Sequence, residues 1–479
     1  MAKKVFISAD HGMALIYFLQ SDLIASLLAA GTEVIVLTDD DIKERISAQF
    51  SRPGLTIEGL RLNQANNYFQ KVDNRRQWLL AYLRRVGGSW RINGEAQISH
   101  IWEVWAENSW KFRLGVWVPA ALATLVLRSS RAARKALVRA QTKFTPNLYA
   151  DLFEKYKPDL VIASTPGWRI DRYLLREAAQ RGVECMTVIV GWDNPSSYAV
   201  PGAPVDWATC WSQEQKDELV YGSDWDPERV NIGGIPSYDG YFRKSWQLPR
   251  DDYFRLHGLD PARKLISYAC SFVHFAPNYP NVEALARLVS SDELSEPSQL
   301  LVRLHPSHFQ DKPRIFADER EKIHALEQKY PHVHVVRPVA LGGSLGYYGG
   351  EDMDEKSSMM AYSDVFVTVY STMVVETAVH DTPIVAAVLD VPGGWNVPGK
   401  FSLSLKEIGN WPTHKRFREA GAGRVAADEA QLRDVLNAYL LDPGLDAGER
   451  KAFIEKEITY TDASAGKRTA DFILKVLEK

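Results

Sequence analysis

The amino-acid sequence predicts an α/β protein of two domains, each built on a parallel sheet that is covered by helices. The chain has 479 residues, which is more than one hydrophobic core of ordinary size accommodates. In both halves, short apolar runs alternate with helical patterns of ten or more residues. Strands separated by such helices pair in parallel, because a parallel connection needs a long crossover. The apolar fraction of 46% and the charged fraction of 24% agree with a globular protein.

The first domain is expected over residues 1–236. It opens with a strand at residues 5–9, then a helix with apolar positions from Leu15 to Leu28 that ends at Gly31, then a strand at 34–37. This βαβ order begins a doubly wound sheet. Further strands are expected at residues 159–163, 185–190, 207–211 and 230–232.

An insertion of helices, rich in tryptophan, is expected at about residues 66–145. Its tryptophans are Trp78, Trp90, Trp102, Trp105, Trp110 and Trp117, and its basic residues include Lys111, Arg113, Arg128, Arg131, Arg134, Lys135 and Arg139. Two interpretations remain open. The insertion is either a helical subdomain with its own core and a solvated basic face, or a surface that contacts the inner face of an anionic membrane with tryptophans at the interface.

The second domain is expected over residues 237–463, after a junction rich in Gly and Pro near residues 233–239. Strands are expected at 265–270, 300–304, 333–336, 365–369 and 384–387, with helices between them. An amphipathic helix at about residues 464–477 ends the chain. In such sheets ligands bind beyond the carboxyl ends of the strands, so polar residues just after strands are the candidates for a site.

Several classes of function are disfavoured. A net charge of −3 gives no general attraction to nucleic acid. No G-x-G-x-x-G follows the first strand and no G-K-[ST] loop occurs, so nicotinamide enzymes and P-loop ATPases lose their usual signatures. The acidic runs at 39–41 and 351–355 are interpreted as caps or turns, so neither a metal nor another cofactor is expected.

The chain is expected in the cytoplasm. Its start passes directly into a strand without an export signal. The longest uncharged apolar stretch, 114–127, is shorter than the roughly 20 residues that span a bilayer and contains Pro119. Cys185, Cys210 and Cys270 have no CxxC spacing and are expected to be buried thiols in a reducing compartment.

The most informative stretch is Arg303-Leu-His-Pro-Ser-His, which leaves a buried strand. Arg303, His305 and His308 are expected at the carboxyl end of that strand, where they could meet a diphosphate. The alternative is a capped loop with a satisfied histidine.

A second candidate begins directly after the strand at 365–369. Ser371 or Thr372 is expected to cap a helix whose first-turn amides could bind phosphate, and Glu376 could bridge two ribose hydroxyls. The alternative is a capping box made by Thr372 and Glu376. Two weaker candidates for the same site are Ser271, after the first strand of this domain, and Arg337, in a loop that could pack on a base.

In the first domain His11 follows the opening strand, and a neutral histidine there could take a proton from an acceptor hydroxyl. Asp10, Asp171 and Asp193 compete with it as bases. Asp193 and Asn194 are interpreted either as acceptor contacts or as groups that fix a turn.

Together these residues resemble the GT-B superfamily of glycosyltransferases, and more narrowly bacterial surface-carbohydrate transferases related to CDP-glycerol glycerophosphotransferases. The resemblance covers the whole chain in architecture and is specific at residues 192–194, 233–241, 303–306 and 371–376. It implies two Rossmann-like domains that face a cleft, with His305, Ser371 and Thr372 on the donor diphosphate and Glu376 on the ribose. It also implies that the helix at 464–479 returns to the N-terminal domain.

The resulting hypothesis is a metal-independent, inverting transfer of a sugar from a nucleotide sugar to a hydroxyl of a glycan or lipid-linked acceptor, with His11 as the first choice of base. If the enzyme is retaining, His11 becomes a positioning group. The alternatives are a CDP-glycerol-type polyol-phosphate transferase, a sugar-nucleotide 2-epimerase and a non-catalytic nucleotide-binding protein.

Overall fold

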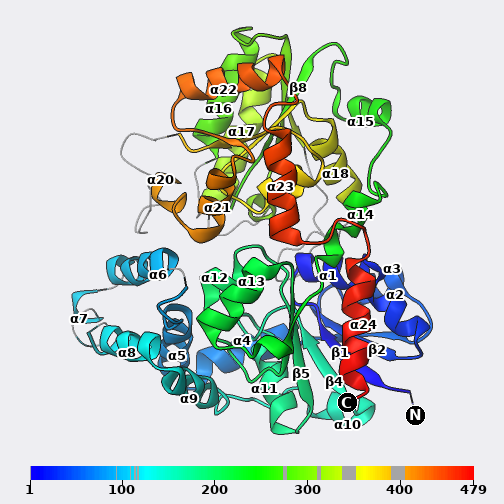
Figure 1. Ribbon diagram of the computed structural model, residues 1–479, viewed down its shortest axis with the longest axis vertical. Helices are drawn as coiled ribbons and strands as arrows, with labels where there is room; N and C mark the ends of the chain where they lie inside the picture. The colour runs from blue at the N-terminus through cyan, green and yellow to red at the C-terminus, as the bar shows by residue number, and fades with distance from the viewer. Residues whose placement is uncertain are drawn as a thin grey trace. The chain divides into compact units, whose positions relative to one another are not determined.

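The computed structural model describes residues 2–92, 94–107, 109–112, 115, 118–272, 278–309, 314–336, 352–389 and 405–479. The chain forms two compact units (Figure 1). Unit 1 contains the residues up to Asp239 and Glu457–Lys479, and unit 2 runs from Gly240 to Lys456. Each unit is built on one parallel sheet, which confirms the predicted α/β class with two Rossmann-like layers.

The sheet of unit 1 has seven strands within the described residues, in the order β3-β2-β1-β4-β5-β6-β7. The strands are β1 (Lys4–Ser8), β2 (Glu33–Thr38), β3 (Leu55–Gly59), β4 (Leu160–Ala163), β5 (Glu184–Val188), β6 (Trp207–Cys210) and β7 (Val230–Ile232). The central strands are rich in Val and Ile and almost wholly buried, because helices cover both faces of a parallel sheet.

Helices of unit 1 connect these strands and cover the sheet. They are α1 (Gly12–Leu19), α2 (Asp22–Ala29), α3 (Lys43–Phe50), α10 (Ala150–Tyr156), α11 (Arg172–Gln180), α12 (Asn194–Tyr198), α13 (Gln213–Asp217) and α24 (Ala465–Leu477). The single helix expected up to Gly31 is in fact two. Ser21 causes the break, since its hydroxyl donates to Tyr17 O (2.6 Å) and accepts from Leu23 N (3.3 Å), which caps α2.

The helical insertion has a hydrophobic core of its own. It comprises α4 (Leu62–Lys71), α5 (Asn74–Val86), α6 (Gly94–Glu107), α7 (Trp110–Phe112), α8 (Val118–Ser129) and α9 (Arg131–Gln141). Its core is formed by Tyr82, Leu83, Val86, Val104, Ala120, Leu127 and Leu137. The helices α5, α6, α8 and α9 therefore form a subdomain with its own core, whereas Leu62 and Ala65 of α4 pack in the core of the sheet.

The sheet of unit 2 has six strands in the described residues, in the order β10-β9-β8-β11-β12-β13. They are β8 (Lys264–Ala269), β9 (Ser298–Arg303), β10 (Val333–Val336), β11 (Val365–Thr368), β12 (Ile384–Ala387) and β13 (Arg424–Ala426). The helices are α14 (Asp239–Phe242), α15 (Arg250–His257), α16 (Tyr279–Ser290), α17 (Ile315–Lys329), α18 (Met353–Tyr362), α19 (Met373–Val379), α20 (Leu405–Ile408), α21 (Pro412–Ala420), α22 (Glu429–Leu441) and α23 (Ala447–Ile458).

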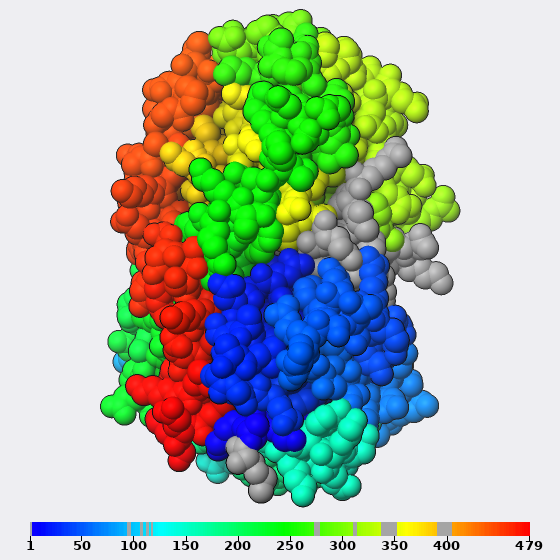
Figure 2. Space-filling view, turned by 90° about the vertical axis from the view of Figure 1, so that its right-hand side faces the viewer, coloured from blue at the N-terminus to red at the C-terminus, as the bar shows by residue number. Residues whose placement is uncertain are grey.

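The last helix, α24, packs against α2 within unit 1, where the two ends of the described chain lie side by side (Figures 1 and 2). Gly466 allows this close approach, since a Cβ at that residue would lie 3.1 Å from Asp22 N. The buried carboxylate of Asp239 accepts hydrogen bonds from Ala465 N (3.1 Å) and Gly466 N (2.8 Å) and so caps the first turn of α24.

No single helix among the described residues is long and apolar enough to cross a membrane, although α1 and α2, bent by 43° at their junction, pass such a test as a pair on length and composition alone. Cys185, Cys210 and Cys270 are all buried and free, as expected.

We predict that α24 carries much of the stability of unit 1. Ile473 is fully buried in this helix, so Ile473→Ala should lower the free energy of unfolding of unit 1 by about 2–5 kcal/mol through lost burial and an unfilled cavity. Calorimetric unfolding would measure the loss. Asp471→Ala, on the exposed side of the same helix, is the control and should change stability by less than about 0.5 kcal/mol. Equal losses in both variants would contradict this role.

Candidate functional site

Each sheet has one point at which the order of the strands reverses. In unit 1 it lies between β1 and β4, and in unit 2 between β8 and β11. The connections that leave the two strands of such a pair run to opposite sides of the sheet. They leave a crevice beyond the carboxyl ends of the two strands. These two places are where a ligand of each unit is expected.

A His–Asp pair lies at the reversal point of unit 1. His11 Nδ1 is 2.7 Å from Oδ1 of Asp10, just beyond β1. The Asp10 side chain is fully buried, and it also accepts from Ser164 Oγ (2.6 Å) and Arg169 Nε (3.1 Å), both just beyond β4. Residues from the two strands that border the crevice therefore hold one carboxylate in place.

The charges of this pair suit proton transfer. Burial alone would raise the pKa of Asp10, but His11, Arg169 and Ser164 together hold this pKa well below its usual range, so Asp10 is ionised. Burial lowers the pKa of His11 and outweighs the opposite effect of Asp10, so the imidazole is neutral at pH 7. A carboxylate only accepts, so the imidazole proton resides on Nδ1 and Nε2 is left as the basic nitrogen.

Asp10 and Asp171, both predicted as competing bases, have other positions in this arrangement. Asp10 orients the imidazole of His11. Asp171 is fully buried before α11, and it accepts from Thr165 N (3.0 Å) and Thr165 Oγ1 (2.7 Å). Burial and the nearby Asp10 raise the pKa of Asp171 to about 7. Asp171 therefore anchors the loop that carries Arg169.

Asp193 lies in a turn after β5, and Asn194 is the first residue of α12. Asp193 accepts from Ser197 Oγ (3.2 Å), and burial raises the pKa of Asp193. Gln215 Nε2 donates to Gly191 O (3.2 Å) and Trp192 O (3.1 Å), which holds the same turn. These contacts agree with the interpretation of the pair as groups that fix a turn.

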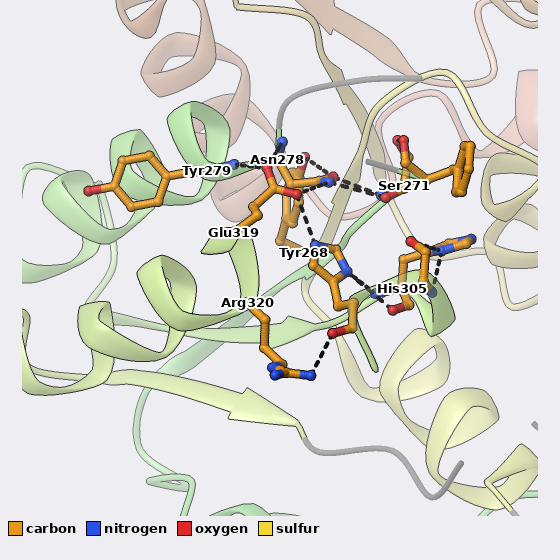
Figure 3. Close-up of polar contacts among 10 residues, drawn as sticks. Tyr268, Ser271, Asn278, Tyr279, His305, Glu319 and Arg320 are labelled. Atoms are coloured by element: carbon orange, nitrogen blue, oxygen red, sulfur yellow. Dashed lines mark hydrogen bonds and ion pairs between the residues drawn. The ribbon is translucent and has the colours of Figure 1, made fainter. Parts of the chain in front are cut away.

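In unit 2 His305 follows β9 and begins the short turn Pro306–Phe309 (Figure 3). Its Nδ1 accepts from Ser307 N (3.1 Å), which places the ring proton on Nε2. Burial, with His308 and Arg303 nearby, lowers the pKa of His305 to about 3. At neutral pH His305 is thus an uncharged donor rather than a cation.

A network of buried hydrogen bonds holds this turn in place (Figure 3). Glu319 lies on α17. Its Oε2 is 2.9 Å from His308 Nε2, and its Oε1 accepts a hydrogen bond from Asn278 N (2.9 Å). Asn278 Oδ1 in turn accepts from Ser271 N (2.7 Å), just beyond β8. His308, expected to meet a ligand, is instead fully buried, because its ring bridges the turn and Glu319. One carboxylate thereby ties together the segments that follow β8 and β9.

Arg303 also has a different position from the expected one. Its guanidinium is paired with Asp352, just before α18, and with Glu355, on α18. The side chain is 11% exposed, and two carboxylates compensate its charge. Two residues of the acidic run interpreted as caps or turns, Asp352 and Glu355, are thus partners of Arg303, which is not placed to neutralise a diphosphate.

The start of α19 holds the second predicted group in unit 2. Ser371 Oγ accepts from Met373 N (3.3 Å), whereas Thr372 makes no capping bond, so the capping box with Glu376 does not form. Glu376 is buried and accepts from Tyr241 Oη (2.6 Å) and Lys356 Nζ (2.5 Å). Ser271 is 6% exposed beyond the neighbouring β8. Arg337 lies outside the described residues.

Sequence reasoning missed several residues of these sites. Ser164 directly follows β4, the same kind of signal that identified His11, and could have been found, whereas Arg169 lies six residues after that strand. Glu319, Asn278, Tyr241 and Lys356 carry no local signal, since each acts through a contact distant in sequence.

The acidic run at 39–41 fixes a turn: Asp39 Oδ1 accepts from Asp41 N (3.1 Å) and Asp40 Oδ2 from Leu62 N (3.0 Å). Within the described residues no group of three or more His, Cys, Asp or Glu side chains is placed to hold a metal ion.

We predict that acid weakens unit 2 through its buried neutral histidines. Burial lowers the pKa of His305 and His414 to about 3 and of His257 and His380 to about 4. Below pH 6.5 the unfolded chain binds protons that the folded unit does not. The free energy of unfolding should therefore fall as the pH drops from 6.5 towards 4, by at most about 1 kcal/mol per pH unit for each fully buried histidine.

Calorimetry between pH 4 and 7 would measure this slope. His414→Gln should reduce the slope by the contribution of about one proton, whereas the control His332→Asn, at an exposed turn, should leave the slope unchanged. A slope that His414→Gln does not alter would contradict the assignment.

Comparison with known proteins gives matches in structure alone. No protein-family model matches the sequence, and no curated protein matches it. The UDP-GlcNAc 2-epimerase of Neisseria meningitidis, bound to UDP-GlcNAc, aligns over 98% of this chain and 100% of its own, with a TM-score of 0.55 and 10% identity. S. aureus MnaA in complex with UDP aligns over 99% and 97%, with a TM-score of 0.54 and 12% identity.

A glycosyltransferase from Rickettsia africae ESF-5 aligns over 100% of this chain and 99% of its own, with a TM-score of 0.50 and 11% identity. At such identities the similarity concerns the fold, and it extends over the whole chain in all three cases. The expected pair of Rossmann-like domains is confirmed, and this chain shares the GT-B fold with these three proteins.

Proposed function

We propose that this protein is an enzyme that acts on a nucleotide sugar, and that it transfers the sugar to a hydroxyl group of a glycan or lipid-linked acceptor. The observation that carries the proposal is the Asp10–His11 pair at the reversal point of unit 1. A neutral imidazole with a fixed carboxylate on Nδ1 and a basic Nε2 is the arrangement that a general base requires.

In the proposed reaction His11 Nε2 takes the proton of the acceptor hydroxyl. The oxygen of that hydroxyl forms a bond to the anomeric carbon of the donor. The bond from that carbon to the donor diphosphate breaks, and the nucleoside diphosphate leaves with the electron pair. Asp10, already ionised, stabilises the imidazolium that forms. Attack from the side opposite the leaving group inverts the anomeric centre.

The donor is assigned to unit 2. The proposal places the diphosphate on His305 Nε2–H and on the hydroxyls of Ser371, Thr372 and Ser271, at the carboxyl ends of β9, β11 and β8. Glu376 is kept as the ribose ligand, since Lys356 and Tyr241 hold its carboxylate in place. Neutral hydrogen-bond donors would stabilise the leaving diphosphate without a metal ion. Ligands named for two of the aligned structures support UDP and UDP-GlcNAc as the first compounds to test.

A second candidate is epimerisation of a nucleotide sugar at C2. It is favoured by the alignment with the Neisseria epimerase over the full length of both chains. An epimerase uses no acceptor, and an inversion that proceeds through removal of the C2 proton would bring solvent deuterium into the sugar. A transferase would release the nucleoside diphosphate only when an acceptor is present.

We predict that one nucleotide stabilises the wild-type protein more than His305→Ala. Thermal unfolding would be followed with UDP, GDP, CDP, CMP, dTDP and ADP, since a ligand at about 100 times its Kd stabilises by roughly 2.7 kcal/mol. His332→Asn is the control and should respond like the wild type. Absence of stabilisation by any nucleotide in folded protein would argue against the donor site. Binding without turnover, with or without acceptor and in deuterated buffer, would indicate a nucleotide-binding protein.

We also predict that His11→Ala lowers kcat by about 10²–10⁴-fold, because a general base accelerates a reaction by a factor of that order. Nucleotide binding in unit 2 should be retained. Asp10→Asn should cost less, since the imidazole remains. It should also shift the acidic limb of the kcat/KM profile, where His11 becomes protonated, to lower pH, because Asp10 raises the pKa of His11. The control is again His332→Asn. An unchanged kcat in His11→Ala would remove His11 as the base.

A further inference from the structure

The helical insertion exposes an unusual amount of apolar surface. Among the described residues, fourteen large hydrophobic side chains are exposed, and eight of them lie between Trp90 and Val126. Single exposed apolar residues are common, but a concentration of this kind marks a surface that binds something.

The exposed residues follow the geometry of the helices. On α8, Val118, Leu122, Leu125 and Val126 are exposed at i, i+4, i+7 and i+8, which places them on one face. The opposite face of α8 buries Ala120, Thr124 and Leu127 in the core of the insertion. Helix α8 is therefore apolar on both sides, although among the described residues only one side is packed in a core.

Two exposed tryptophans lie on the helices that precede α8 in the chain. Trp102 on α6 is 50% exposed, and Trp110 at the start of α7 is 65% exposed. An indole ring combines an apolar body with a polar N–H, which suits the boundary between lipid chains and water. We call the exposed side chains of Val118, Leu122, Leu125 and Val126 on α8 the apolar face of the insertion.

The sequence on both sides of the apolar face is strongly basic, although Arg128 and Arg134 are buried and Arg134 is paired with Asp224. Between Glu107 and Asp151 the sequence has no acidic residue and eight basic ones: Lys111, Arg113, Arg128, Arg131, Arg134, Lys135, Arg139 and Lys143. On α9, which packs against α8, Arg131, Lys135 and Arg139 are exposed at i, i+4 and i+8. They form a basic stripe along one side of α9.

We propose that the apolar face and the basic stripe of α9 bind the surface of an anionic lipid membrane. The apolar side chains would enter the boundary between headgroups and acyl chains, and the basic side chains would contact the anionic headgroups. Charge complementarity favours lipid over a second copy of this chain, because two copies joined at this face would bring their basic stripes together without acidic partners. The inference goes beyond the proposed reaction and does not depend on it.

Binding to vesicles tests the proposal directly, without nucleotide or acceptor. Wild-type protein should sediment with phosphatidylcholine vesicles that contain 30% phosphatidylglycerol, and much less with phosphatidylcholine alone. Leu122→Asp/Leu125→Asp should abolish sedimentation. The matched control is Leu256→Asp/Leu441→Asp, which adds the same charges at residues 62% and 69% exposed in unit 2 and should bind like the wild type.

The electrostatic part has its own variant. Arg131→Gln/Lys135→Gln/Arg139→Gln should weaken binding to the anionic vesicles by about 100-fold, since each basic residue near such a surface contributes roughly five-fold. Raised salt should have a similar effect. The control Arg255→Gln/Arg314→Gln/Lys415→Gln removes the same residue types from exposed sites elsewhere and should bind normally.

Three outcomes would overturn the proposal. Wild-type protein could stay in the supernatant with both kinds of vesicle. Each control could lose as much binding as its matched variant. The protein could also form a dimer that Leu122→Asp/Leu125→Asp dissociates, without any binding to lipid, in which case the apolar face joins two copies of the chain. Because no nucleotide is used, none of these results bears on the donor site or on His11.

Discussion

Parallel pairing of the strands is the constraint on which both candidate sites depend. Because every strand of a sheet runs the same way, the segments that leave the strands all emerge at one edge. Asp10 and Arg169 are 159 residues apart and still share an ion pair, since they follow the neighbouring strands β1 and β4. In unit 2 the same geometry brings the segments after β8 and β9 to Asn278 and Glu319.

Much of the fold could be predicted from the sequence, because the central strands of a parallel sheet are apolar on both faces. The strands that were missed, β3 and β13, lie at the edges of the two sheets and are only partly buried, so they lack continuous apolar runs. The break between α1 and α2 was missed for another reason. The apolar period continues across it, and only the hydrogen bonds of Ser21 mark the new start.

For the sites, the sequence indicated which residues follow strands but not which way their side chains point. His11 and His305 were found by position alone. The contacts that give them their chemistry were beyond reach, because Asp10 as an orienting partner and Ser307 as a donor to Nδ1 depend on local backbone geometry. Arg303 shows the limit most clearly: its position at the carboxyl end of β9 was predicted, yet Asp352 and Glu355, about fifty residues later, pair with its guanidinium.

The packing of α24 on α2 has a consequence for how the protein is made. Helix α2 emerges from the ribosome early, whereas α24 follows more than four hundred residues later. At about 5–20 residues per second, that interval is roughly 20 to 90 seconds. During this time unit 1 lacks its last helix, while nearly all of unit 2 is synthesised. The first unit to begin is thus the last to be completed, and the nascent chain must tolerate an unfinished surface for as long as synthesis takes.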